Sequence, residues 1–275
     1  MSATVADIVD VMEGIAPTQL AEAWDNPGLQ VGDHRWPVKK IMVALDPTLA
    51  VLNHAAEASV DMLITHHPLL FRPLKSVDLA TPIGGIIGTA VRNTIAVYAA
   101  HTNLDSAREG LNDMLAARLG LTNVTVLSPT GDEAPTEVVE IDGNGLGRIG
   151  DLPKATDPLS LCRTLKRELG LESVRMAGDT TQEVGRVAIC TGSGGSLLDR
   201  FFSSGADAFI TGDVRYHEAR DAEDRQAVLI DIGHFGSEHI MVSKLGGRLR
   251  EMLGRTYPDV EVITCEVEKD PFVIV

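Results

Sequence analysis

The feature that most constrains the fold is an alternation of short apolar runs and helical segments that occurs twice along the chain. Ile41–Leu45 and Asp61–Thr65 are typical of buried strands, because they are short, largely apolar and contain β-branched residues. The segment between them, Thr48–Ala58, places apolar residues on one side of a helix. A shift of 146 residues superposes this stretch on Val187–Thr211 without gaps. Strands alternating with helices predict βαβ units and a largely parallel sheet.

We interpret the repeat as an internal duplication. The predicted fold class is α/β, with two related α/β halves whose mixed, mostly parallel sheets are flanked by helices. The alternative is that any two βαβ units look alike at low identity. The expected halves are residues 1–128 and 129–275, because 129–135 is rich in proline, glycine and acidic residues, as connectors are. Each half is expected to end in a strand, at Asn123–Leu127 and at Val260–Cys265.

Two local signals predict where helices begin. Thr81-Pro82 combines an N-cap residue with proline at the first helical position. Ser106 and Glu109 form the Ser-x-x-Glu pattern of a capping box, which predicts a helix from there to about Leu119.

Composition excludes several classes of function. The chain has 24 Lys and Arg against 39 Asp and Glu, a net charge of −15, which argues against binding to nucleic acid or to an anionic membrane. Its three cysteines are far apart, so neither a disulfide framework nor a Cys-x-x-Cys site is expected. The first ten residues lack the basic start of a signal peptide, and the longest weakly polar stretch, Leu79–Val91, is too short to span a bilayer. We therefore expect a soluble, cytoplasmic protein.

A pair of histidines follows one of the predicted strands. His66 and His67 come directly after Asp61–Thr65, at the strand end where ligands gather in parallel α/β sheets. Adjacent side chains that leave a strand point in different directions, so this pair suits two neighbouring ions better than one. By itself the pair also fits a structural or an exposed role.

A His-x-x-x-acid pattern follows a strand in each half. His101 and Asp105 form it in the first half and His234 and Glu238 in the second, and the surrounding sequence aligns Val97 with Ile230. Each acid could instead only cap the helix that follows. Together with the histidine pair, the two patterns give more imidazole and carboxylate groups than one four-coordinate ion needs. They therefore indicate two divalent ions, of zinc, iron, manganese, nickel or cobalt, bridged by a carboxylate or a water.

Three further features have two interpretations each. Trp24-Asp25-Asn26 is either a loop beside the site or a turn anchored by a buried tryptophan. Gly192–Gly195 precedes a helix and is either a plain turn or a cradle for an anion. His217 lies near the position equivalent to the histidine pair, which Gly212-Asp213 occupies in the second half, and is interpreted as a substrate contact or a general acid. The glycine-rich segment Gly143–Gly147 is expected to be a tight turn.

The sequence resembles the NIF-three-like family, whose members are often called GTP cyclohydrolase 1 type 2 homologues. The segments that carry the resemblance are Trp24–Gly32, Ile64–Pro68, Ala100–Asp105, Ile210–Asp213, Tyr216-His217 and Asp231–Glu238. It implies that two metal ions are bound by His66, His67, Asp105, His234 and Glu238, with Glu238 as the bridge. In that family His101 is either a ligand or a neighbour of the ligands. The resemblance also implies a toroidal homohexamer whose metals face an internal cavity.

Together, these expectations predict that the protein is a metal-dependent hydrolase. Two ions would lower the pKa of a bridging water toward neutrality and deliver hydroxide to an electrophilic centre, with His101 or His217 moving a proton. The family name implies opening of the imidazole ring of GTP, although no basic phosphate loop is evident in the sequence. The alternative is a non-catalytic metal-binding protein, such as an assembly factor or metal carrier, and a third possibility is a ring-forming scaffold that its metals stabilise.

Overall fold

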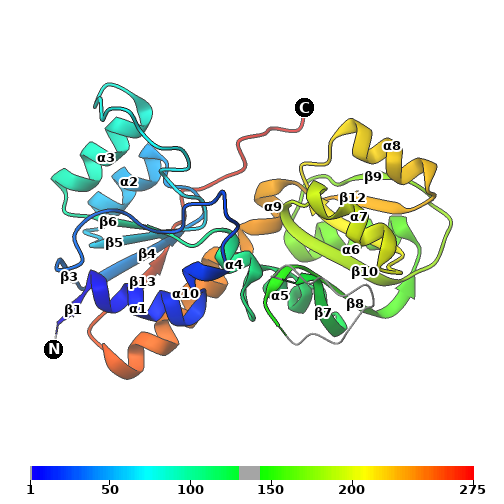
Figure 1. Ribbon diagram of the computed structural model, residues 1–275, viewed down its shortest axis with the longest axis horizontal. Coiled ribbons are helices and arrows are strands. Elements are labelled where there is room, and N and C mark those ends of the chain that lie inside the picture. Colours follow the sequence, from blue (N-terminus) through cyan, green and yellow to red (C-terminus); the bar gives the residue numbers. More distant parts are fainter. Residues whose placement is uncertain (1, 130–142) are drawn as a thin grey trace. The chain divides into compact units, whose positions relative to one another are not determined.

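The computed structural model describes residues 2–129 and 143–275, which form two compact units (Figure 1). The first unit consists of the chain up to Leu104 together with Met241–Lys269, and the second consists of Asp105–Ile240 together with Asp270–Val275. These units do not follow the division expected at residue 128. The expected connector at 129–135 lies almost wholly outside the described residues.

The first unit is a five-stranded sheet covered by helices on both faces. Strand order is β13-β4-β5-β6-β2, and all neighbours are parallel except β2, which is antiparallel to β6. The strands are β2 (Gly28–Val31), β4 (Lys40–Ala44), β5 (Met62–Thr65), β6 (Ala96–Ala99) and β13 (Glu261–Thr264). Helices α2 (Leu49–Glu57) and α3 (Pro82–Arg92) cover one face, and α1 (Val5–Ile15) and α10 (Ile240–Thr256) cover the other (Figure 1). β1 (Ala3–Thr4) and β3 (Pro37–Val38) pair in a separate two-stranded antiparallel sheet.

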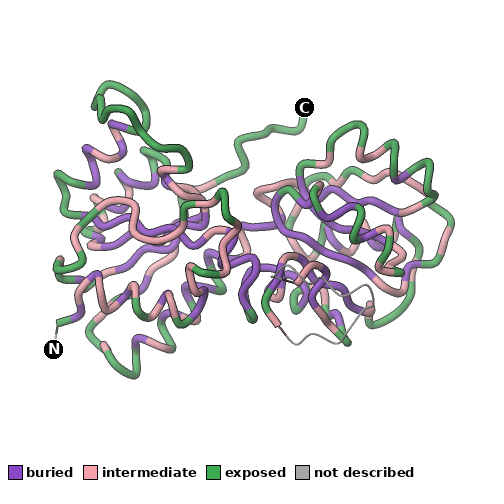
Figure 2. Tube along the Cα trace, viewed as in Figure 1, coloured by how far each residue is buried: buried purple, intermediate pink, exposed green. Residues whose placement is uncertain are grey.

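The second unit is a six-stranded sheet in the order β7-β8-β10-β11-β12-β9. The strands are β7 (Thr122–Pro129), β8 (Gly145–Thr156), β9 (Arg175–Ala177), β10 (Val184–Ser193), β11 (Ala208–Gly212) and β12 (Val228–Asp231). Its helices are α5 (Leu111–Arg118), α6 (Pro158–Leu169), α7 (Leu198–Ser203), α8 (Tyr216–Asp224) and α9 (His234–Glu238). Alternate residues along the strands face opposite cores, so that Ile210 packs with α5 and α6 while Phe209 packs with α7 and α8. Figure 2 shows these central strands as buried.

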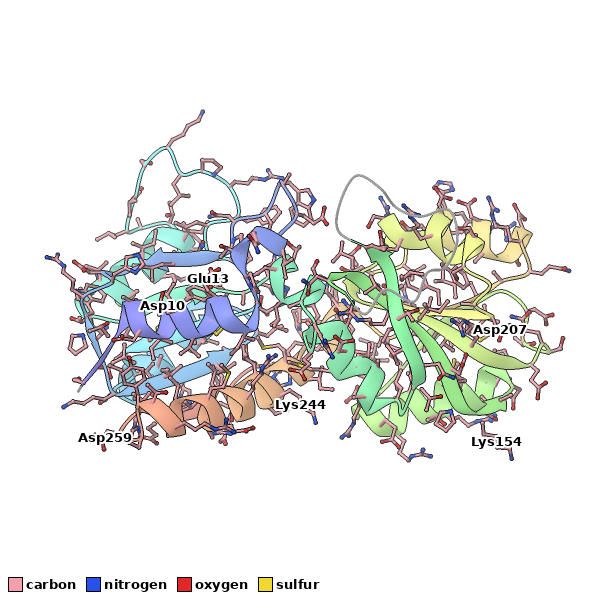
Figure 3. The ribbon with its side chains drawn as sticks, turned by 60° about the horizontal axis from the view of Figure 1, so that its bottom comes forward. Asp10, Glu13, Lys154, Asp207, Lys244 and Asp259 are labelled. Atoms are coloured by element: carbon pink, nitrogen blue, oxygen red, sulfur yellow. The ribbon has the colours of Figure 1, made fainter. Side chains whose placement is uncertain are left out.

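The repeat predicted from the sequence is present in the strand order. β4-β5-β6-β2 and β10-β11-β12-β9 are each three parallel strands followed by an antiparallel edge strand. Asp61 Oδ2 accepts hydrogen bonds from the amides of Lys39 and Lys40, at 2.7 and 2.9 Å. Asp207, which Figure 3 labels, accepts the equivalent bonds in the second unit at 2.8 Å. The donors there are the amides of Gly185 and Arg186.

The strand register corrects one detail of the predicted alignment. Leu63 pairs with Val97 in the first unit, and the equivalent Phe209 pairs with Leu229 in the second. Val97 therefore corresponds to Leu229 and not to Ile230. The second unit has one more residue between the strand and its histidine, and Gly233 there adopts a φ of 77°.

Pairing in the two sheets departs from expectation in two ways. The first sheet is mostly parallel as predicted, but the second also contains three antiparallel pairings, because β7, β8 and β9 all run against their neighbours. The C-terminal strand β13 was expected in the second half, yet Glu261 pairs with Lys40 of β4 in the first sheet. Helix α10 brings β13 there, since its apolar residues Leu245 and Leu249 are buried in the first unit.

The helix predicted to open at Ser106 begins later. Ser106 is the last residue of the short helix α4 (Thr102–Ser106) and is fully buried, and α5 begins at Leu111 with Gly110 as its N-cap. Glu109 has a φ of 57°, which is not helical, so the capping box cannot form. The signal at Thr81-Pro82 was correct, because Thr81 accepts a hydrogen bond from the Gly84 amide at the start of α3.

Among the described residues, no helix combines the length and the apolar character needed to cross a bilayer. Gly145 and Gly147, expected in a tight turn, instead lie in β8 with positive φ values of 157° and 68°.

Candidate metal centre

In the first unit, the end of β5 positions two histidines. Thr65 is the last residue of the strand, and its hydroxyl donates a hydrogen bond to the carbonyl of His67 at 2.8 Å, which turns the chain. The amides of His66 and His67 both donate to the carbonyl of Leu45 at the end of β4. The two imidazole rings lie 5.1 Å apart and are inclined by 47°.

His101 follows the neighbouring strand β6 and joins this pair. Its ring lies 5.1 Å from the ring of His66 and 5.7 Å from that of His67. One nitrogen from each of the three rings lies within 4.8 Å of the other two. His66 is fully buried, and the other two are partly exposed. Three histidines that the sequence placed on two separate strands therefore meet at one edge of the first sheet.

Each of these rings is held through its Nδ1 atom. His66 Nδ1 lies 2.8 Å from the carbonyl oxygen of Ala100, His67 Nδ1 lies 2.7 Å from Asp46 Oδ1, and His101 Nδ1 lies 2.7 Å from Asp25 Oδ1. These oxygens are acceptors, so a neutral ring carries its proton on Nδ1 and keeps its lone pair on Nε2. Metal-binding histidines are oriented in this way.

The carboxylate behind His101 is the more deeply buried of the two. The side chain of Asp25 is 0% exposed, whereas that of Asp46 is 42% exposed. Burial by itself raises the pKa of Asp25, but hydrogen bonds from His101 and Thr102 outweigh it and lower the pKa to about 2. Asp25 is therefore ionised at neutral pH and holds a fixed negative charge against His101. Glu268 accepts bonds from the amides of Leu45 and Asp46, and burial raises its pKa.

The second unit holds its own histidine and acid. His234 is the first residue of α9, and Glu238 lies one turn later with its side chain 3% exposed. His234 Nδ1 lies 2.7 Å from Asp213 Oδ2, and its Nε2 lies 3.1 Å from Glu238 Oε2. The fourth histidine is thus oriented like the three in the first unit.

The strand end beside Glu238 requires glycine. Gly192, with a φ of 61°, lies so close to Glu238 that a Cβ atom would overlap Oε1. Its amide donates to Ser237 Oγ at 2.9 Å, and the amide of Gly194 donates to Thr211 Oγ1 at 2.9 Å. The amides of Gly192 and Gly194 therefore have protein partners and are not available to an anion, and Gly192 and Ser193 are the last residues of β10.

Asp105 is buried in the second unit. Its Oδ1 accepts a hydrogen bond from Thr191 Oγ1 at 3.3 Å. Burial raises the pKa of the Cys190 thiol, and the carboxylates of Asp105 and Glu238 raise it further, so both acids lie near this thiol. Among the described residues, neither Asp105 nor His217 belongs to a group of three or more potential ligands within 4.8 Å of one another.

Two further residues named in the sequence analysis, His217 and Trp24, have exposed side chains. His217 is exposed in the first turn of α8, with its ring 5.4 Å from that of Tyr216. Trp24 is 58% exposed and its ring lies 6.1 Å from that of His101. The interpretation of Trp24 as a buried anchor is wrong, because the loop places it beside the histidines.

Three acids orient the histidines, and none of them was assigned this role from the sequence. They are Asp25, Asp46 and Asp213. Asp25 and Asp213 lie inside the quoted motifs, and Asp46 comes two residues after the end of β4, so each had a positional signal. Their partners were not visible, because the bonds join residues 76 and 21 positions apart.

Comparison with known proteins assigns the chain to a family. A family model described as Duf34/NIF3 (NGG1p interacting factor 3) matches residues 3–271. The chain is a member of the DUF34/NIF3 family. The resemblance seen in the sequence is therefore confirmed.

Relatives and solved structures extend over the whole of this DUF34/NIF3 protein. A "GTP cyclohydrolase 1 type 2 homolog" from Clostridium perfringens is 38% identical over 268 residues, 97% of each chain. A Bacillus cereus protein related to NIF3 superposes with a TM-score of 0.91 at 26% identity, covering 100% of both chains. The Staphylococcus aureus protein SA1388 gives a TM-score of 0.91 at 30% identity with the same coverage. These neighbours confirm the mixed α/β fold.

The donor set of the first unit fits a divalent metal ion. Imidazole nitrogens suit zinc, iron, copper and nickel, and three of them match the protein ligands of catalytic zinc sites, which keep one position open. The carboxylates behind two of the rings supply the partners that such ligands need.

Proposed function

We propose that this DUF34/NIF3 protein is a metal-dependent hydrolase that holds two divalent ions per chain. The observation that carries the proposal is the group of three histidines at the end of β5 and β6, each held through Nδ1 by an oxygen acceptor. The proposed ligands are those implied by the family: His66, His67, Asp105, His234 and Glu238. His101 is proposed as a further ligand, because its ring belongs to the same group.

Ions bound there would act as Lewis acids and would lower the pKa of a bound water toward 7. The chain's own residues prepare this chemistry. Asp25, whose ionised side chain is fully buried, fixes His101 in one orientation, and Asp46 does the same for His67. Glu238, nearly fully buried, is proposed as the bridging carboxylate. With His101 used as a ligand, the exposed His217 is proposed to move the proton.

The proposed substrate is a nucleotide, on the ground that the relatives are named GTP cyclohydrolase 1 type 2 homologues. The proposed assembly is the toroidal homohexamer that the resemblance implies, and the proposed location is the cytoplasm. The identity of the ions is proposed only as a class: zinc, iron, manganese, nickel or cobalt.

A second candidate function is a non-catalytic metal carrier or assembly factor. The observation that favours it is the cavity beside His101, which is described below. No lysine or arginine is found among the described residues that line this cavity, so it offers no positive charge to a triphosphate. A carrier would use the same ligands, so the presence of metal does not distinguish the two functions.

Turnover and metal content together test the proposal. The purified protein is loaded with each of the five ions in turn, its metal content is measured by elemental analysis, and GTP loss is followed by chromatography. We expect two ions per chain and GTP hydrolysis with at least one ion. His67→Ala should abolish GTP hydrolysis. The matched control is His54→Ala, at a half-buried position of α2, which should change neither the metal content nor the rate of GTP hydrolysis.

Two ions per chain that exchange readily without any nucleotide hydrolysis would favour the carrier. Metal content that His67→Ala leaves unchanged would contradict both functions.

A further inference from the structure

A cavity of about 610 Å³ lies in the first unit beside His101. Its walls come from the loop Trp24–Asn26, from Gln30 and Val31 of β2, from the irregular segment Leu70–Val77 and from Ile87 of α3. The rings of Trp24 and Phe71 meet edge to face with their centres 5.8 Å apart, and the ring of Phe71 lies 6.4 Å from that of His101. The volume is within the range of small-molecule sites, and the aromatic wall adjoins the histidine group.

Side-chain amides hold the two walls together. Asn26 Nδ2 donates to the carbonyl of Leu70 at 2.7 Å, and the amide of Leu70 donates to Gln30 Oε1 at 3.1 Å. Gln30 Nε2 donates in turn to the carbonyl of Asn26 at 2.8 Å. The first two bonds join segments 44 and 40 positions apart, so the cavity is formed before any ligand binds, which lowers the entropy cost of binding.

The lining defines the kind of group that fits. Among the described residues that line the cavity, Asp25 alone is ionisable, and its carboxylate already accepts bonds from His101 and Thr102. Much of the remaining surface is apolar, from side chains such as Leu74 and Val77. A charged ligand group would lose its hydration here without gaining a partner. A flat, uncharged ring would instead gain contact with two aromatic side chains.

The two aromatic residues are also unusually exposed. Trp24 is 58% and Phe71 46% exposed, and the segment 71–83 is exposed throughout (Figure 2). Contiguous apolar side chains exposed at the surface are typical of ligand-binding grooves and of interaction sites. Their position beside three potential metal ligands points to the substrate and not to a separate ligand.

We propose that this cavity binds a flat, uncharged aromatic ring of the substrate and so brings the adjoining part of that molecule to the histidine group. The reaction at that group rests on the proposed hydrolytic function, but binding of the ring requires no metal. Phosphate or other charged groups of the same molecule lie outside the cavity.

Binding of guanosine to the metal-free, full-length protein tests the proposal. Guanosine is uncharged and carries a flat ring, and its dissociation constant is measured by equilibrium dialysis after treatment with EDTA. Phe71→Ala should weaken binding about tenfold or more, the size of one stacking contact with a base. Leu79→Ala is the matched control, because Leu79 is 57% exposed near the same segment but does not line the cavity. Ribose 5-phosphate should not displace guanosine.

Three results would overturn the proposal. Guanosine could fail to bind, it could bind equally to Phe71→Ala and to the unaltered protein, or ribose 5-phosphate could displace it. If guanosine fails to bind and Phe71→Ala lowers the oligomeric state in sedimentation, the exposed face is a contact between copies of the chain. Because the assay uses metal-free protein, failure of the hydrolytic function leaves guanosine binding intact, and failure of the ring site leaves metal binding intact.

Discussion

Asp25→Asn is the substitution that most directly tests how the three-histidine group is built. The Asp25 carboxylate accepts bonds from His101 Nδ1 at 2.7 Å, from the Thr102 amide at 3.0 Å and from Thr102 Oγ1 at 2.5 Å. Asparagine keeps the shape but replaces one acceptor oxygen with an NH₂ donor, so at least one of these three donors faces another donor. The negative charge against the His101 ring is also lost.

The expected loss of metal affinity depends on how far the carboxylate is buried. A hydrogen bond to a charged group contributes about 1.5–3 kcal/mol, and loss of a partner behind a metal ligand typically weakens metal binding about 10- to 100-fold. The side chain of Asp25 is fully buried, so we expect a loss near the upper end, about 2.7 kcal/mol for 100-fold. Asp46 is 42% exposed, and solvent can replace it, so Asp46→Asn should cost about 1 kcal/mol or less.

The assay is titration of Zn²⁺ or Mn²⁺ into EDTA-treated protein in competition with a fluorescent chelator. Asp25→Asn should bind metal at least about twentyfold more weakly than Asp46→Asn, which itself should remain within about fivefold of the unaltered protein. Thermal unfolding of the metal-free variants controls for loss of fold. Equal affinities for the two variants would refute the argument from burial, and an unchanged affinity for Asp25→Asn would show that His101 is not a ligand.

The other predictions concern the second unit and the ligand set. Gly192→Ala should lower the free energy of unfolding in urea by about 1–3 kcal/mol, because the φ of 61° and the overlap with Glu238 both oppose a Cβ atom; no change would contradict the close approach. Arg148→Met should cost about 3 kcal/mol in the same measurement, since Arg148 is 2% exposed and its guanidinium donates to the buried carbonyls of Gly145, Gly147 and Ala107; an unchanged free energy of unfolding would mean that solvent replaces these bonds. His66→Ala and Glu238→Ala should each reduce bound metal below two per chain by elemental analysis, and unchanged content in both would falsify the proposed ligand set.

Much of the secondary structure could be predicted because it depends on neighbours in the chain. Thr48 and Thr81 cap their helices as local pattern rules require, and β5 is a run of apolar residues bounded by polar ones. The duplication was visible for the same reason, since a gapless shift preserves each local pattern. Where burial outweighed a local signal the prediction failed: Ser106 fits a capping box by sequence but is fully buried at the end of α4.

The candidate site divides in the same way. Its histidines could be predicted because each follows the end of a strand, and the ends of strands can be predicted from runs of apolar residues. The acids that orient these histidines could not be predicted, because Asp25 and the histidine that it hydrogen-bonds, His101, are 76 positions apart in the sequence.

The sequence by itself determined the strands, the repeat, the family and the residue types available to bind metal. The tertiary structure alone decided which strand joins which sheet, as β13 beside β4 shows, and which acid orients which histidine. The physical reason is that hydrogen bonds and hydrophobic burial act between atoms that are close in space. Local propensity reports only on atoms that are also close along the chain.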